Sequence, residues 1–327
     1  MKIGLIDVDK ETLNNDFPNL ALMKISAWHK KQGDSVEWYQ PLFSGHMDKV
    51  YMSKVFSFTP DYEYFIDADT IEKGGTGYSI IQVDGREFFD KNLHKNLPPE
   101  IEHIYPDYSI YGITDTAYGF LSRGCPRGCD FCIVKDKEGL CATKVADLSE
   151  FWNGQKNICL YDPNILACKD WENLLQQLSD SKARVDFNQG LDIRMMTDRK
   201  AEMLSQIKVK RLHFAWDRIE DGEIIKPKFL QFRERSKINN HDLVVYVLCG
   251  DRERRLLDSD LHRVYWLRDH GYAPYVMLYE KQKLQSGSDL RRFQRFVNNR
   301  FIFWRCKDFE EYKRRGDDDD GETDESR

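Results

Sequence analysis

Strand and helix patterns alternate between residues 116 and 285, and this alternation limits the fold more than any other feature of the chain. Apolar segments typical of strands cover residues 118–122, 157–161, 184–188, 211–215, 243–249 and 273–278. Helical spacing of apolar residues lies between them, at residues 171–181, 198–206 and 256–270. Strand–helix–strand order favours parallel strands joined by right-handed crossovers. We therefore predict an α/β fold with a partial (β/α)6 barrel of the TIM type, whose site is built at the carboxyl ends of the strands.

A smaller α/β pattern precedes this region. Residues 3–6 and 35–39 are predicted strands on either side of a helix over residues 20–31. Residues 49–53 and 64–66 are further strand candidates. The order predicts a Rossmann-like parallel domain.

These patterns predict four regions of the chain. We expect the Rossmann-like domain at residues 1–112, the barrel at 113–285, a basic and aromatic extension at 286–315, and a tail at 316–327. The formal net charge of −6 comes entirely from the tail, which carries seven acidic residues against one arginine. Such a segment is typical of a disordered, solubilising terminus.

The segment Gly74-Gly75-Thr76-Gly77 has two interpretations. A glycine-rich loop allows a ligand or phosphate to approach the backbone. A turn between two strands needs the same residues, and the pattern favours this second interpretation.

No apolar stretch of the chain is long enough to span a bilayer, and the amino terminus lacks the pattern of a signal peptide. We therefore expect a cytoplasmic protein without a membrane partner. Its eight cysteines are then kept reduced, and clustered thiols point to metal or redox chemistry.

Three of the cysteines lie within eight residues. Residues 121–132 read Leu-Ser-Arg-Gly-Cys-Pro-Arg-Gly-Cys-Asp-Phe-Cys, which spaces Cys125, Cys129 and Cys132 as C-x3-C-x2-C. Thiolates are the usual ligands of iron–sulfur clusters, and three of them leave one iron of a four-iron cluster open. Zinc is the alternative metal, but no histidine or fourth cysteine stands at the spacing that a closed tetrahedral site needs.

This segment resembles the radical S-adenosylmethionine superfamily, whose motif is C-x3-C-x-aromatic-C with Phe131 as the aromatic residue. The resemblance implies a [4Fe-4S] cluster on the three cysteines, with S-adenosylmethionine bound at the open iron and cleaved to a 5′-deoxyadenosyl radical. It also implies a flavodoxin- or ferredoxin-like electron donor. Cofactor contacts in the family come from the ends of successive strands, and the residues at those positions here are Asp162, Asn164, Gln189, Arg194 and Asp217.

The amino-terminal pattern resembles the cobalamin-binding domain that precedes the barrel in one branch of this superfamily. The motif that supplies a histidine to cobalt is absent, and His29 and His46 do not stand in such a context. Two interpretations stay open, a domain that binds cobalamin without this histidine and a domain that has kept only the fold. If cobalamin binds, methyl transfer is the expected reaction; otherwise the substrate and the reaction are not identified by the sequence.

Two alternative functions remain. Residues 291–315 interleave nine basic side chains with six phenylalanine or tryptophan side chains, which suits RNA binding but equally a terminal helix and strand that bury their aromatic side chains. An iron–sulfur redox or scaffold protein without radical chemistry is the other alternative. The scattered cysteines, whose roles the sequence leaves open, are Cys141, Cys159, Cys168, Cys249 and Cys306.

Overall fold

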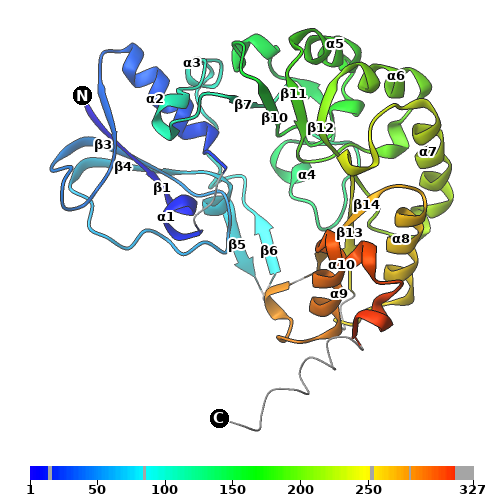
Figure 1. The fold of residues 1–327 in the computed structure, drawn as a ribbon. Coiled ribbons are helices and arrows are strands. Elements are labelled where there is room, and N and C mark those ends of the chain that lie inside the picture. The colour runs from blue at the N-terminus through cyan, green and yellow to red at the C-terminus, as the bar shows by residue number, and fades with distance from the viewer. Residues whose placement is uncertain (14–16, 84–85, 251–253, 280, 314–327) are drawn as a thin grey trace, which may run out of the picture. The chain divides into compact units, whose positions relative to one another are not determined.

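A computed structural model describes residues 1–13, 17–83, 86–250, 254–279 and 281–313 (Figure 1). The chain divides into two compact units, Met1–Val185 and Asp186–Arg327. Both contain parallel β-strands and α-helices, which confirms the α/β class. The four regions predicted from the sequence stay predictions, and the predicted tail at 316–327 lies outside the described residues.

The first unit begins with a four-stranded parallel sheet in the order β2-β1-β3-β4. Its strands are β1 (Lys2–Asp7), β2 (Ser35–Trp38), β3 (Met47–Ser53) and β4 (Ala68–Gly74). A short helix α1 (Val8–Leu13) follows β1, and helix α2 (Leu20–Lys31) leads to β2. Successive side chains of β1 point to opposite faces of the sheet and pack in two hydrophobic clusters. Ile3 and Leu5 pack with Leu22 of α2, and Ile6 packs with Val50 of β3.

Helix α2 covers the predicted residues. The Asn19 side chain accepts a hydrogen bond from the backbone N–H of Leu22 at 3.2 Å and so caps the first turn. Gly33 follows the helix with φ of 87°, a left-handed conformation that glycine adopts without strain.

The strand predicted at residues 64–66 is wrong. This segment forms no strand and precedes β4, and Tyr64 and Phe65 are exposed. The aromatic residues suggested a strand, but no neighbouring strand buries them. The glycine-rich segment is a turn, because Gly74 ends β4 and the following 3-10 helix leads into β5.

The rest of the first unit carries shorter elements. They are β5 (Ile80–Val83), β6 (Arg86–Phe89), α3 (Pro99–Glu102), β7 (Thr116–Gly119), β8 (Ser122–Arg123), α4 (Val134–Lys137), β9 (Thr143–Lys144), β10 (Asn157–Leu160) and α5 (Trp171–Ser181). β5 pairs with β6 and β8 with β9, both antiparallel, whereas β7 and β10 are parallel.

The strand predicted at residues 118–122 is split in the structure. β7 ends at Gly119, which packs against the Phe151 ring, and β8 begins only at Ser122. The backbone N–H groups of Leu121 and Ser122 donate to the Asp162 carboxylate, so they take no part in a continuous ladder.

The second unit continues the alternation. Its elements are α6 (Asp198–Gln206), β12 (Lys208–Ala215), α7 (Gly222–Arg235), β13 (Leu243–Cys249), α8 (Asp258–Asp269), β14 (Ala273–Leu278), α9 (Asp289–Asn298) and α10 (Arg300–Arg305). β11 (Arg184–Phe187) spans the division between the units, and the strand order of the larger sheet is β14-β13-β12-β11-β10-β7. Strands β13 and β14 and helices α5 and α6 match the predicted bounds.

Eight 3-10 helices complete the elements of the described residues. They are Thr76–Ser79, Tyr108–Tyr111, Leu148–Glu150, Ile165–Ala167, Ile193–Met195, Ile219–Asp221, Asn240–Asp242 and Lys281–Lys283.

Helices α6, α7 and α8 of the second unit follow one another on one side of its strands (Figure 1). Phe214 of β12 is fully buried and meets the rings of Phe229 and Phe232 of α7 edge-on, at centroid distances of 5.6 and 5.2 Å. His213 precedes Phe214 in the strand, so its side chain points to the opposite face of the sheet.

The described residues of the carboxyl-terminal extension form helices, among them α9 and α10, and no strand, so the strand expected there is wrong. Phe293, Phe296, Phe303 and Phe309 are buried, which is the packing interpretation of this segment. The exceptions are Phe301, 86% exposed, and Trp304, 53% exposed. Among the described residues, no helix has the length and apolar character required to cross a membrane.

Candidate functional site

The cysteine loop of residues 124–142 is closed by the pairing of β8 with β9, in which Ser122 faces Lys144 and Arg123 faces Thr143. Gly124 begins the loop with φ of 90°, and a Cβ at this position would lie 2.1 Å from the carbonyl oxygen of Cys141. The N–H of Cys125 donates to the carbonyl of Gly139 at 3.1 Å. Glycine at residue 124 is therefore required by the backbone conformation and by the close approach of the two ends of the loop.

Cys125, Cys129 and Cys132 are each partly exposed, and none is in a disulfide. The N–H of Cys132 donates to the carbonyl of Cys129 at 3.0 Å, which forms a turn between the second and third thiols. Phe131 lies in this turn and is 49% exposed. In the part of the chain that the structure describes, no three His, Cys, Asp or Glu side chains are placed to hold a metal ion, so the three-cysteine ligand set stays a prediction.

Asp162 follows β10 and holds the entry to the cysteine loop. Its carboxylate accepts hydrogen bonds from the N–H of Leu121 at 3.0 Å, from the N–H of Ser122 at 2.5 Å and from the Ser122 hydroxyl at 2.7 Å. Burial raises the pKa of Asp162 to about 6, and the hydrogen bonds oppose this shift. The observed contacts make Asp162 a positioning residue, and its predicted contact with a cofactor stays a prediction.

Asn164, two residues further along, contacts the first cysteine. Its Nδ2 lies 3.5 Å from Cys125 Sγ, and the residue is 1% exposed. Within the described residues its Oδ1 is buried without a hydrogen-bond partner. An unsatisfied buried oxygen of this kind costs about 1–3 kcal/mol, and a ligand that donates a hydrogen bond would remove the cost.

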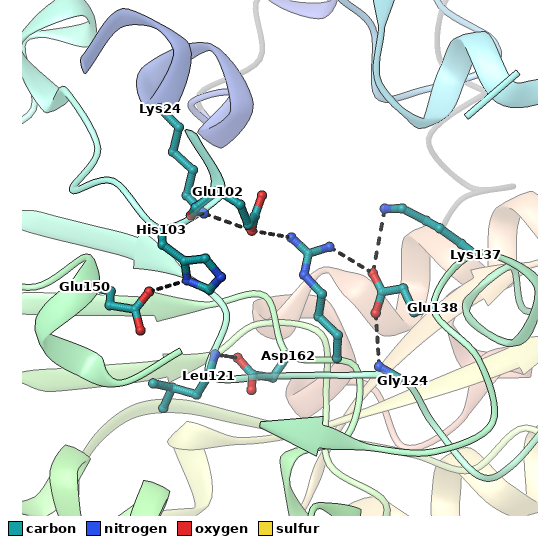
Figure 2. A network of polar contacts seen from close by, with 10 residues as sticks. Lys24, Glu102, His103, Leu121, Gly124, Lys137, Glu138, Glu150 and Asp162 are labelled. Atoms are coloured by element: carbon teal, nitrogen blue, oxygen red, sulfur yellow. Dashed lines mark hydrogen bonds and ion pairs between the residues drawn. The ribbon is translucent and has the colours of Figure 1, made fainter. Parts of the chain in front are cut away.

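A chain of charged side chains leads from α2 to the cysteine loop. Lys24 Nζ lies 2.9 Å from Glu102 Oε1, and Arg123 lies 3.4 Å from both Glu102 Oε1 and Glu138 Oε1. Figure 2 shows Lys24 and Glu102 on one side of these contacts and Glu138 and Lys137 on the other. Glu138 also accepts a hydrogen bond from the N–H that precedes Cys125, so the network ends on the backbone of the candidate site.

Burial is the largest influence on the pKa values of the lysines in this row of charged side chains. It lowers the pKa of Lys24 and of Lys137, and the carboxylates of Glu102 and Glu138 oppose the shift. The guanidinium of Arg123 lies over the Phe120 ring, 3.9 Å from its centroid.

The remaining predicted cofactor residues lie in the second unit. Gln189 is exposed, and Arg194 contacts Asp192 at 2.7 Å and Asp221 at 3.1 Å. Asp217 accepts a hydrogen bond from the N–H of Leu248 at 3.2 Å. Burial raises the pKa of Asp217, while the charges of Arg263 and Arg194 oppose the shift.

Sequence reasoning missed a polar cluster on strands β11, β12 and β13. His213 Nδ1 lies 2.9 Å from the Phe187 carbonyl oxygen and 3.9 Å from Asp186 Oδ1, and its ring stacks on Tyr246 at 5.0 Å. Burial raises the pKa of Asp186 and lowers that of His213. The available signal was a titratable residue next to buried apolar residues in each of two strands, at a position that alternates with the core residues.

The two histidines considered for cobalt do not fit that role. The ring nitrogens of His29 lie 2.7 Å from Asp34 Oδ2 and 3.0 Å from the Tyr51 hydroxyl. Those of His46 lie 2.8 and 3.2 Å from carboxylate oxygens of two exposed aspartates. Both rings already use both nitrogens, so neither presents a lone pair to a metal.

The carboxyl edge of the four-stranded sheet is also filled by the chain itself. Asp9 accepts hydrogen bonds from the N–H of Val55 at 2.5 Å and from the Thr59 hydroxyl at 2.6 Å. A Cβ on Gly75 would lie 2.3 Å from the Lys54 carbonyl oxygen, so this glycine admits a neighbouring backbone segment. These contacts are all made within the chain, and cobalamin binding stays a prediction.

The five scattered cysteines divide by exposure. Cys141 is exposed, whereas Cys159, Cys168, Cys249 and Cys306 are buried. Burial raises the pKa of the Cys249 thiol, which keeps it protonated and suits a packing role.

No protein-family model matches the chain, and no curated protein matches it.

Proposed function

We propose that this chain is a radical S-adenosylmethionine enzyme that binds a [4Fe-4S] cluster through Cys125, Cys129 and Cys132. The observation that carries the proposal is the cysteine loop itself. Three partly exposed thiols lie in one short segment whose backbone is held by Gly124, by Glu138 and by the β8–β9 pairing. Three thiolates with one open iron suit coordination by a second cofactor.

The fold that we propose with this function is a Rossmann-like domain followed by a partial (β/α)6 barrel. The parallel strand order and the alternation of helices and strands support it. We also propose that the protein works in the cytoplasm with a flavodoxin- or ferredoxin-like electron donor.

When bound and reduced, the cluster would supply the electron that cleaves S-adenosylmethionine to methionine and a 5′-deoxyadenosyl radical. Asn164 would accept a hydrogen bond from the cofactor through its unpartnered Oδ1. Asp162 would keep the loop entry in place through its contacts with Leu121 and Ser122. Contacts of Phe131, Gln189, Arg194 and Asp217 with the cofactor are part of the same proposal.

The test is anaerobic purification and cluster reconstitution of the full chain, followed by incubation with dithionite and S-adenosylmethionine. We expect about four iron ions per chain and formation of 5′-deoxyadenosine. Cys129→Ala should lose both. Cys141→Ala is the matched control, because Cys141 is an exposed cysteine of the same loop that does not belong to the C-x3-C-x2-C motif, and it should retain both.

Other outcomes would identify the alternatives. A cluster that forms but does not respond to S-adenosylmethionine would indicate an iron–sulfur redox or scaffold protein. Tightly bound zinc in place of iron would contradict the proposal.

An RNA substrate is a second candidate, favoured by the carboxyl-terminal helices. Phe301 and Trp304 are exposed, and Trp304 lines a surface hollow of about 410 Å³ together with Arg268, Arg305 and Lys307. Aromatic faces stack bases and basic side chains contact phosphates. If RNA binds here, Trp304→Ala should weaken binding of a single-stranded RNA, and affinity should fall steeply with salt; equal binding by the variant would remove this candidate.

A further inference from the structure

Asn164 lies outside the cysteine loop, and its side chain donates a hydrogen bond to the sulfur of a predicted cluster ligand, Cys125. Its Nδ2 lies 3.5 Å from Cys125 Sγ. From this geometry we infer that Asn164 is a positioning residue that raises the reduction potential of the cluster by donating a hydrogen bond to the Cys125 sulfur. The inference rests on the proposed function.

The chemistry of the two groups fixes which end of the amide faces the sulfur. A metal-bound thiolate has no proton and carries only lone pairs, so it repels the amide oxygen and accepts from the amide N–H. A hydrogen bond to a cluster sulfur withdraws negative charge from it. The reduced cluster, which carries one more electron, gains more from this than the oxidised one, and the potential rises.

The surroundings of Asn164 hold its amide at a fixed place. Ile165 and Leu166 are buried directly after it, and the carbonyl of Asn164 accepts a hydrogen bond from the N–H of Ala167 at 3.1 Å. Asp162, two residues earlier, ties the same strand end to the loop entry. Because the short segment that follows β10 contacts both the loop entry, through Asp162, and Cys125, through Asn164, the distance from the amide to the sulfur is set by the fold and not by a mobile surface side chain.

The amide also has an unused acceptor. Asn164 Oδ1 is buried without a partner among the described residues, so the inferred N–H donation to the sulfur does not compete with a bond made by the oxygen. A donor from a bound ligand at Oδ1 would polarise the amide and strengthen the N–H bond to Cys125. Binding at the open iron and the potential of the cluster would then be coupled through one side chain.

The test compares Asn164→Ser, which shortens the side chain, with Asn157→Ser as the matched control. Asn157 begins β10, the strand that precedes Asn164, and its Nδ2 lies 3.3 Å from the carbonyl oxygen of Asp115. Each reconstituted chain is titrated with dithionite in the presence of redox mediators, and the reduced cluster is followed by electron paramagnetic resonance. Iron content and the Fe–S(Cys) stretching bands in resonance Raman spectra are measured on the same samples.

We expect Asn164→Ser to bind the same amount of iron as the unmodified chain and to shift the reduction equilibrium about tenfold toward the oxidised state. For a one-electron couple this is a fall in potential of about 59 mV. One Fe–S(Cys) band should shift in this variant. Asn157→Ser should match the unmodified chain in both measurements.

Equal potentials and equal Fe–S(Cys) bands in the unmodified chain and in Asn164→Ser would overturn the inference and leave the proposed function intact. An unmodified chain that binds no iron would overturn both. If Asn164→Ser does not bind iron, Asn164→Leu replaces it in the test. Leucine has a similar volume and no hydrogen-bond donor, so this variant should show the same fall in reduction potential. A Leu variant at the unmodified potential overturns the inference.

Discussion

The carboxylate of Glu138 accepts a hydrogen bond from the backbone N–H of Gly124 at 3.2 Å, one residue before the first cysteine of the loop. The Glu138 side chain is nearly buried and also pairs with Arg123 at 3.4 Å and Lys137 at 3.7 Å. A helix-end residue 14 positions along the chain therefore holds the start of the candidate site. This contact is tertiary, and no motif in the sequence marks Glu138.

Replacing Glu138 by alanine should lower the free energy of unfolding by about 1–3 kcal/mol, because it leaves the N–H of Gly124 without its acceptor and removes one of the two carboxylates that pair with Arg123. Urea unfolding measures the change. Glu72→Ala is the control, since Glu72 forms a largely exposed pair with Lys49 and should cost about 0–1 kcal/mol. Equal costs for the two variants would contradict the role given to Glu138.

Gly124→Ala should disrupt the loop more than Gly139→Ala. Both residues have φ near 90°, which costs a side chain about 1–2 kcal/mol. At Gly124 the added Cβ would also lie 2.1 Å from the Cys141 carbonyl oxygen, whereas at Gly139 no atom lies within 4 Å. The difference between the two variants in unfolding free energy and in iron uptake isolates the steric clash, and similar behaviour would show that the approach of the loop ends is unimportant.

Asp162 should make stability depend on pH. Its folded-state pKa of about 6 lies above the ordinary value of 3.8, so folding favours the protonated form. The resulting stabilisation is complete below pH 4 and is lost as the pH rises through 6, with a total on the order of 3 kcal/mol. Asp162→Asn lacks this dependence, so unfolding free energies measured from pH 4 to 7 should fall more steeply for the unmodified chain; parallel curves would contradict the prediction.

Arg263 should be essential to the second unit. The buried guanidinium donates to the carbonyls of Trp216 at 2.7 Å and Leu248 at 2.9 Å, and it pairs with Asp260 at 2.5 Å. Arg263→Met removes the cation beside the buried Asp260 carboxylate and the donor to three carbonyls, those of Trp216, Asp217 and Leu248, and should cost about 3–5 kcal/mol in unfolding free energy. Arg235→Met, which removes an exposed pair, should cost about 0–1 kcal/mol; a comparable loss in the two variants would refute the assignment.

Regular periodicity made several elements of the second unit predictable, although helix α7 and the first three residues of β12 were not predicted. The strands Leu243–Cys249 and Ala273–Leu278 and the helix Asp198–Gln206 have the predicted bounds, because each carries its own apolar spacing and is limited by local turn residues. The segment 64–66 failed for the opposite reason. A strand needs a partner, and three aromatic or aliphatic residues in a row do not say whether one is available.

The amino-acid sequence alone determined the α/β class, most of the helices and strands, and the spacing of Cys125, Cys129 and Cys132, since these depend on neighbours within a few residues. The tertiary structure decided what surrounds the cysteines. Asn164 reaches Cys125 across 39 positions and Glu102 reaches Arg123 across 21, and such contacts depend on which strand ends and loops the fold brings together. Burial likewise raises the pKa of Asp162, because desolvation is set by the whole surrounding chain and not by the local sequence.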